Sequence, residues 1–335
     1  MRYIIIGAGA VGGTIGGRLY ESGHDVVLVA RGAHYAALRE GGLRLVTPEG
    51  ARTLDVPAVD GPDALRLSAD DVLVLAVKSQ DTAAVLEQWG QGPVGDGVAA
   101  DLLPLVCAQN GVENERVALR TFRRVYGLCV WLPASHLEPG VVAAHTAPLS
   151  GILTVGRYPH GTDPLIEQIA ADLEASVFAA PVVPDVMRWK YGKLLNNLGN
   201  ALDAVLGREP DKDQLLEQLY RRARAEGVAA LTAAGIDFTD EAERRAVQGD
   251  RMTVVPVDGV PRAGGSTWQS LARGTGATEA DYLNGEIALL GRRFGVPTPV
   301  NDLLQRIAVR FARERRAPGS MSAAELEALA AALPE

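Results

Sequence analysis

The first thirty residues alternate between short apolar runs and one longer helical stretch. Residues 3–6 form a β-branched apolar run, a glycine-dense turn follows, and Thr14 to Ser22 has helical spacing that ends at Gly23. A second β-branched run occupies Val26 to Val29. A strand, a turn, a helix and a strand in this order predict one βαβ unit with two parallel strands.

The same alternation continues along the chain. Val72 to Val77 and Leu102 to Val106 are typical of buried strands, and Gln80 to Trp89 between them has helical spacing. From residue 125 to residue 155, prolines and glycines interrupt the apolar runs, which indicates further strands joined by turns. This pattern predicts an α/β fold with a doubly wound sheet of the Rossmann type.

Beyond the proline-punctuated segment 180–184, strand-like runs nearly vanish. Asp185 can cap a helix through Met187 to Leu206, and Asp213 to Ala234 and Glu279 to Phe294 also keep helical spacing. We therefore expect two domains, a Rossmann-type dinucleotide-binding domain over residues 1–183 and a mainly α-helical domain over residues 184–335.

Composition narrows the classes of partner and compartment. The 33 Lys and Arg against 41 Asp and Glu give a net charge of −8, which argues against nucleic acid or an anionic membrane as a partner. No apolar run approaches the ~20 residues that a bilayer span needs. The two cysteines, Cys107 and Cys129, cannot form a disulfide framework, and no basic leader is visible, so we expect a cytoplasmic protein.

The glycine-dense turn matches the G-x-G-x-x-G fingerprint of dinucleotide-binding sites. In this motif the first glycine permits a tight turn, the second lets the backbone approach a pyrophosphate, and the third lets helix and strand pack closely. The N-terminus of the following helix then offers free N–H groups to the phosphates. The alternative is a tight turn without a ligand, but its place inside a βαβ unit favours a cofactor. The candidate residues are Gly7, Ala8, Gly9, Ala10, Val11 and Gly12.

Residues at the ends of the predicted strands indicate which dinucleotide is bound. A site that prefers NAD has an acidic residue after the second strand, but here Ala30-Arg31-Gly32 follows Val29. The Arg31 guanidinium matches a 2′-phosphate in charge and geometry, which favours NADP. Lys78 and Asn110 also follow predicted strands, where ligands of such sheets gather. The alternatives without a ligand are an ordinary surface lysine at Lys78 and an ordinary Asn-Gly turn at Asn110.

In the second domain, Lys190 to Asn200 carries an unusual set of polar residues. At about 100° per residue, Lys190, Asn197 and Asn200 lie within about 60° of Lys193 on one face of a helix. A solvated face is the common fate of such residues, but asparagine is a poor helix former and its repetition favours a functional stripe.

Two further segments carry hydroxyl and acidic groups. Ser266 lies in a glycine-led loop, and Thr278-Glu279 begins another helix, where capping alone accounts for the glutamate. The five histidines show no metal-ligand spacing and the cysteines form no C-x-x-C, so no metal is expected.

Taken together, these motifs resemble the ketopantoate reductase family from Gly7 to about Asn301. The resemblance implies a Rossmann domain and a helical domain with the active site between them, and NADPH-dependent reduction of a 2-keto acid, 2-dehydropantoate, to pantoate in pantothenate and coenzyme A biosynthesis. It places the catalytic lysine at Lys193, with Asn197 four residues later, and a supporting acid at Glu279. Arg31 and Lys78 would hold the NADP phosphate and Asn110 the nicotinamide side, while Asn197, Asn200 and Ser266 would hold the substrate.

The sequence departs from the family pattern in two places. Ala201 stands where a second helix asparagine is expected, and the interval from Ser266 to Glu279 is one residue longer. These departures leave open a related reductase with another keto-acid substrate, and a non-catalytic NADP-binding sensor is an alternative of another class. Lys190 is a second candidate for the catalytic lysine, and a homodimer is expected from the helical domain.

Overall fold

The computed structural model describes residues 1–207, 212–257, 259–260 and 264–333. They form two compact units, one of Met1–Lys190 with Asp240–Arg262 and one of Tyr191–Thr239 with Ala263–Glu335. The first unit thus extends past the expected boundary at residue 183, and the division falls inside helix α7 (Val186–Asn197). A later segment also groups with the first unit because its strand β16 (Met252–Val254) pairs with β13 (Thr146–Pro148).

The first unit is built on an eight-stranded sheet. The strand order is β15 (Phe178–Ala179), β14 (Gly151–Arg157), β10 (Arg124–Trp131), β9 (Pro104–Cys107), β6 (Asp71–Leu75), β1 (Arg2–Ile6), β2 (Asp25–Val29), β5 (Ala58–Val59). The six strands from β10 to β5 in this order are parallel to one another, and β14 runs antiparallel to β10. Because the chain adds β2 on one side of β1 and β6 on the other, the topological switch point lies between β1 and β6.

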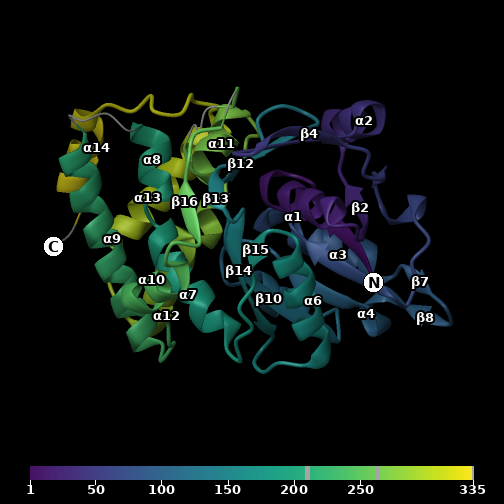
Figure 1. Cartoon of the computed structure of the whole chain (residues 1–335). Helices are drawn as coiled ribbons and strands as arrows, with labels where there is room; N and C mark the ends of the chain where they lie inside the picture. The colour runs from purple at the N-terminus through teal and green to yellow at the C-terminus, as the bar shows by residue number, and fades with distance from the viewer. Residues whose placement is uncertain (208–211, 258, 261–263, 334–335) are drawn as a thin grey trace. The chain divides into compact units, whose positions relative to one another are not determined.

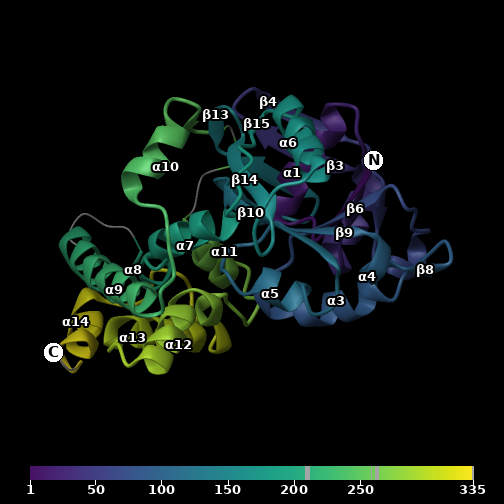
Figure 2. The same ribbon diagram turned by 90° about the horizontal axis from the view of Figure 1, so that it is seen from below.

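Helices cover both faces of this sheet (Figure 2). On one face lie α1 (Ala10–Glu21) and α6 (Pro164–Ala175), and on the other lie α3 (Thr82–Gly90), α4 (Ala99–Leu102) and α5 (Asn114–Ala118). Strand β1 serves both cores, since Tyr3 and Ile5 face the first and Ile4 and Ile6 the second. Burial on both faces explains why the strands are continuous apolar runs.

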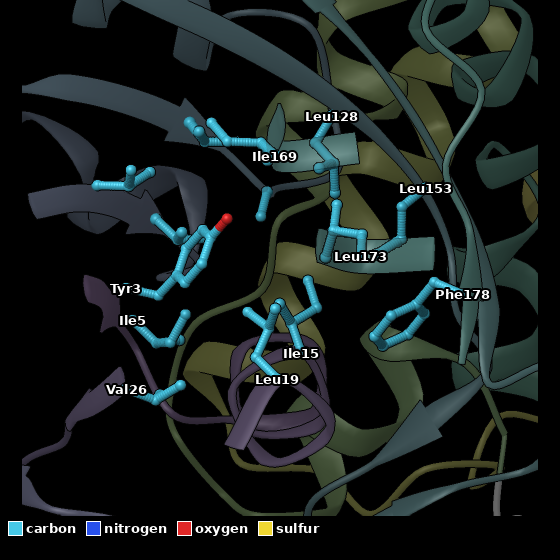
Figure 3. Packing of buried hydrophobic residues seen from close by; sticks show 14 of the residues in the cluster. Tyr3, Ile5, Ile15, Leu19, Val26, Leu128, Leu153, Ile169, Leu173 and Phe178 are labelled. Atoms are coloured by element: carbon cyan, nitrogen blue, oxygen red, sulfur yellow. The ribbon is translucent and has the colours of Figure 1, made fainter. Parts of the chain in front are cut away.

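Figure 3 shows the core beneath α1 and α6. Ile15 and Leu19 of α1 pack in the same cluster as Ile169 and Leu173 of α6, and all four are at most 3% exposed. Tyr3 reaches through this core to donate a hydrogen bond from its hydroxyl to Asp172 at 2.6 Å. Ile15 and Leu19 thus hold the glycine-bearing helix α1 in this core.

Smaller elements complete the first unit. A four-stranded sheet has the order β11 (Ala134–Ser135), β12 (Val141–Ala144), β3 (Leu43–Thr47), β4 (Gly50–Leu54), and β7 (Pro93–Val94) pairs with β8 (Gly97–Val98). Helix α2 (Gly32–Gly41) follows β2, and α10 (Glu241–Gln248) belongs to the returning segment.

The described part of the second unit contains helices and turns but no β-strand. Helices α9, α12 and α13 contact one another, and α11 and α13 contact α8 (Figure 1). Their bounds are α8 (Asn200–Leu206), α9 (Asp213–Ala233), α11 (Ser266–Ala272), α12 (Asn284–Phe294), α13 (Pro299–Arg313) and α14 (Ala323–Ala331). The expected fold class, a Rossmann-type sheet followed by a mainly helical part, is confirmed.

Three helices differ from their expected extents. Helix α12 begins at Asn284 rather than Glu279, because the short 3-10 helix Ala280–Tyr282 precedes it. Helix α1 begins at Ala10 rather than Thr14, because the Gly9 carbonyl already accepts a hydrogen bond from the Gly13 N–H at 2.7 Å. The helix expected over residues 187–206 is interrupted after Asn197, and α8 begins anew at Asn200. The single helical face assumed for Lys190 to Asn200 is therefore wrong at its C-terminal end.

Candidate active site

The glycine loop follows β1 at the switch point and has the close packing that the fingerprint predicts. Gly7 has φ +106°, and a Cβ there would lie 2.8 Å from the backbone of Ala76 and Val77. A Cβ on Gly12 would lie 2.1 Å from the Gly7 carbonyl oxygen. The N-cap of α1, Gly9, has no side chain to bond the first amides of the helix. Those N–H groups and the helix dipole suit the phosphates of a dinucleotide.

Two histidines that the sequence analysis did not single out support this loop. The His34 imidazole bonds the Ala8 carbonyl oxygen through Nε2 at 2.7 Å, and its Nδ1 accepts the Gly140 N–H at 2.9 Å. Because Gly140 is the donor, the His34 proton lies on Nε2 and is donated to Ala8. The His136 ring packs on His34 with centroids 4.3 Å apart. The contacts of His34 with Gly140 and His136 join residues more than a hundred positions apart, so no local spacing could reveal them.

Arg31 and Lys78 flank the glycine loop at the carboxyl edge of the sheet. Arg31 follows β2 as the N-cap of α2, is exposed, and donates from Nη2 to Gln88 Oε1 at 3.1 Å. Lys78 follows β6, is half-buried, and precedes the short 3-10 helix Ser79–Asp81. Since β2 and β6 are the two neighbours of β1, both cations follow strands adjacent to the one that leads into the loop.

The Asn110 turn follows β9, the next strand at this edge. Its backbone is held by a polar network, because the Asn110 carbonyl oxygen accepts hydrogen bonds from Asn114 Nδ2 at 3.1 Å and Ser79 Oγ at 3.5 Å. Gln109 Nε2 donates to the Val77 carbonyl oxygen at 2.9 Å and to Thr82 Oγ1 at 2.8 Å. The turns that carry Lys78 and Asn110 are thus tied together.

Lys190 lies in the part of α7 that belongs to the first unit. Lys190 is 3% exposed, and its ammonium pairs with the Glu115 carboxylate and donates to the Gln109 carbonyl oxygen at 3.0 Å. Burial raises the pKa of Glu115, although the Lys190 charge opposes this. The sequence placed Lys190 on one helical face with Lys193, but in the structure the Lys190 ammonium forms an ion pair with Glu115 inside the first unit.

In the second unit, Lys193 and Asn197 occupy the last two turns of α7 and are half-buried. Leu194 and Leu195 between them are at most 1% exposed, which orients this part of the helix. The Asn197 Nδ2 atom is buried and has no hydrogen-bond acceptor among the described residues. A buried amide donor of this kind suits an oxygen atom of a ligand.

The break between α7 and α8 has its own support. Asn284 Nδ2 donates to the Leu198 carbonyl oxygen at 3.1 Å and to Asn301 Oδ1 at 3.0 Å. Asn301 Nδ2 in turn donates to the Ala223 carbonyl oxygen at 2.9 Å. This buried chain of amides satisfies a carbonyl that a continuous helix would bond, so Asn284 belongs to the framework of the Asn197 segment.

Asn200, Ser266 and Glu279 complete the candidates of the second unit. The Asn200 side chain lies 3.4 Å from where a Gly265 Cβ would stand, which brings α8 next to the start of α11, where Ser266 lies in a helix and not in the expected loop. Asn200 also lines a cavity of about 410 Å³ with Asn196, Asp203 and Tyr220. Glu279 is half-buried, and its charge raises the pKa of Arg273, which burial lowers more strongly. Thr278 Oγ1 accepts the Ala280 N–H at 3.4 Å, but the N-cap of the short 3-10 helix Ala280–Tyr282 is Glu279 and not Thr278 as expected.

Among the described His, Cys, Asp and Glu side chains, no group of three or more could hold a metal ion. Within the same described residues, no helix combines the length and the apolar character that crossing a bilayer requires.

Known proteins match both parts of the chain. The family model "Ketopantoate reductase PanE/ApbA" matches residues 3–160, and its C-terminal counterpart matches residues 185–310. A 2-dehydropantoate 2-reductase of Pyrococcus horikoshii is 27% identical over 312 residues, which cover 91% of this chain and 95% of the relative.

Solved structures share the fold. The PanE/ApbA family ketopantoate reductase of Ralstonia eutropha JMP134 has a TM-score of 0.75 at 29% identity, covering 94% of this chain and 100% of that one. A D-mandelate dehydrogenase complex with NADH and anilino(oxo)acetate has a TM-score of 0.76 at 21% identity, covering 95% and 100%. At that identity the second likeness concerns the fold alone.

Proposed function

Because the chain belongs to the ketopantoate reductase family, we propose that it reduces 2-dehydropantoate to pantoate with NADPH, a step of pantothenate and coenzyme A biosynthesis. The observation that carries this proposal is the family match over both parts of the chain, from residue 3 to residue 160 and from residue 185 to residue 310. The matches include the glycine loop and the lysine–asparagine helix.

The residues at the switch point fit NADPH. The space that a Cβ would fill at Gly7 and Gly12 is taken by backbone, so the loop can bring its amides close to a pyrophosphate. The Arg31 guanidinium and the Lys78 ammonium would hold the 2′-phosphate, and the Asn110 amide would orient the nicotinamide side. When bound, NADPH supplies the hydride.

Lys193 would provide the charge and the proton that carbonyl reduction requires. As hydride reaches the carbonyl carbon, negative charge grows on the carbonyl oxygen, and an ammonium there stabilises it and donates a proton. Asn197, Asn200 and Ser266 would hold the carboxylate and hydroxyl of the substrate, and Glu279 would steady the lysine or the substrate oxygens. The commitment of Lys190 to Glu115 supports Lys193 over Lys190 in this role.

A second candidate is reduction of another 2-keto acid by the same mechanism. Ala201, which is 2% exposed, stands where a second helix asparagine is expected from the family pattern, and alanine offers the substrate no side-chain hydrogen bond there. A reductase whose substrate lacks the corresponding hydroxyl would lose nothing by this change.

The test measures NADPH oxidation by the purified chain with 2-dehydropantoate, pyruvate and 2-ketoisovalerate, each also with NADH. Preferred turnover of 2-dehydropantoate with NADPH is the expected result. Turnover of another keto acid alone would transfer the proposal to the second candidate. Binding of NADPH without turnover of any of them would support a sensor. Light scattering on the same sample tests the expected homodimer, and the cytoplasmic location stays a prediction.

Removal of the Arg31 guanidinium should change cofactor preference. We expect Arg31→Ala to raise the KM for NADPH about 10–100-fold, because charged hydrogen bonds to the phosphate are lost. The KM for NADH should stay nearly unchanged. Arg39→Ala is the matched control, because Arg39 lies on the same helix with the same charge but contacts Tyr35 instead. Equal weakening toward both cofactors would contradict a 2′-phosphate site at Arg31.

A further inference from the structure

Lys190 and Glu115 form a buried ion pair that the proposed reaction does not use. The side chains are 2% and 0% exposed, and the Lys190 ammonium also donates to the Gln109 carbonyl oxygen at 3.0 Å. Both residues lie in the first unit. Lys190 is the last residue of α7 that belongs to this unit, and Glu115 lies in α5. The pair therefore joins α7 to the segment that follows β9.

Stability alone is a weak reason for such a pair. The desolvation penalty of two buried charges often cancels their attraction, and apolar residues of similar volume do as well or better. Two acceptors in this cluster, Glu115 Oε2 and Gln109 Oε1, are buried and have no hydrogen-bond donor among the described residues. Selection for stability alone would not leave two buried acceptors without a hydrogen bond, so the cluster is better explained by a role in holding the surrounding backbone in one geometry.

The pair holds the geometry of the two turns that carry Lys78 and Asn110. Lys190 donates a hydrogen bond to the carbonyl oxygen of Gln109, the residue directly before Asn110. The Gln109 side chain bonds the carbonyl of Val77, the residue directly before Lys78. Asn114, the neighbour of Glu115, bonds the Asn110 carbonyl at 3.1 Å. A displacement of Lys190 would therefore reach both turns through Gln109.

We propose that Lys190 is a positioning residue of the cofactor site, which fixes the Gln109–Asn110 turn so that Asn110 and Lys78 meet the dinucleotide in one arrangement. This inference rests on the proposed function, since it requires NADPH at these turns. Lys190 acts on the cofactor only through Gln109 and Glu115. Its loss should weaken NADPH binding at temperatures where the protein is fully folded.

The experiment compares Lys190→Met with the double variant Lys190→Met/Glu115→Gln. The single variant leaves a buried carboxylate unpaired, so it should lose thermal stability and bind NADPH about tenfold more weakly. The double variant removes the uncompensated charge and should regain stability, but it still lacks the hydrogen bond to Gln109 and should stay about tenfold weaker. NADPH titration by nucleotide fluorescence and thermal unfolding provide the two readouts.

Arg2→Met is the matched control. Arg2 pairs with the buried Asp71 at 2.8 Å in the same unit, but at the amino ends of β1 and β6, the edge opposite the glycine loop. It should lower the unfolding temperature and leave NADPH affinity unchanged. Wild-type affinity in the double variant would overturn the inference and make the pair merely structural. Absence of NADPH binding by the wild-type chain would overturn the proposed function, and the inference with it.

Discussion

Replacement of Lys193 by alanine is expected to lower kcat for 2-dehydropantoate reduction by about 10²–10⁴-fold, with little change in NADPH affinity. The ammonium acts on charge that develops only as hydride is transferred, so its loss falls on the transition state more than on binding. The measurement is steady-state NADPH oxidation together with an NADPH titration of each variant.

Lys193→Met is the shape-matched control for this prediction, because it keeps the length of the side chain and removes its charge. Both variants should unfold at the wild-type temperature, since the flanking Leu194 and Leu195, not Lys193, are buried in the second unit. A variant that retains more than about a tenth of the wild-type kcat would show that Lys193 does not donate the proton.

The sequence predicted the parts of the molecule whose causes are local. Continuous β-branched runs such as Val26–Val29 became strands buried on both faces, and the helical spacing of Asp213 to Ala234 became helix α9 (Asp213–Ala233). The glycine fingerprint could also be predicted, because it is a motif within one βαβ turn, although Gly7 and Gly12 in the structure also approach Ala76, which follows the neighbouring strand.

The parts that escaped prediction depend on contacts between distant segments. Periodicity predicted one helix through Leu198, but the structure breaks it there because Asn284, far along the chain, supplies the hydrogen bond to the Leu198 carbonyl. Helical spacing placed Lys190 on a polar face, whereas in the structure it pairs with Glu115 on another helix. A polar residue on a helix can serve a ligand, a solvent face or a buried pair, and spacing alone cannot distinguish these fates.

The glycine loop offers a second large effect, in which stability and binding can be separated. Gly12→Ala is expected to destabilise the first unit by about 3 kcal/mol or more and to abolish NADPH binding. The new methyl group would lie 2.1 Å from the Gly7 carbonyl oxygen and 2.9 Å from the side chains of Ala76 and Ile5. Alanine favours a helix over glycine by only about 1 kcal/mol, so the clash dominates.

Gly9→Ala is the matched variant in the same loop. Among the described residues, a Cβ on Gly9 would meet only the His136 ring, at 4.0 Å, and the backbone there is extended with φ −73°, so the fold should tolerate the change. The methyl group would nevertheless stand where the pyrophosphate approaches the backbone, and NADPH should bind at least about tenfold more weakly. Thermal unfolding and NADPH titration of the two variants should therefore diverge, with stability lost in Gly12→Ala alone and binding lost in both. Wild-type NADPH affinity in Gly9→Ala would show that the dinucleotide does not cross this loop, and a wild-type unfolding temperature in Gly12→Ala would show that the loop relaxes around the added methyl group.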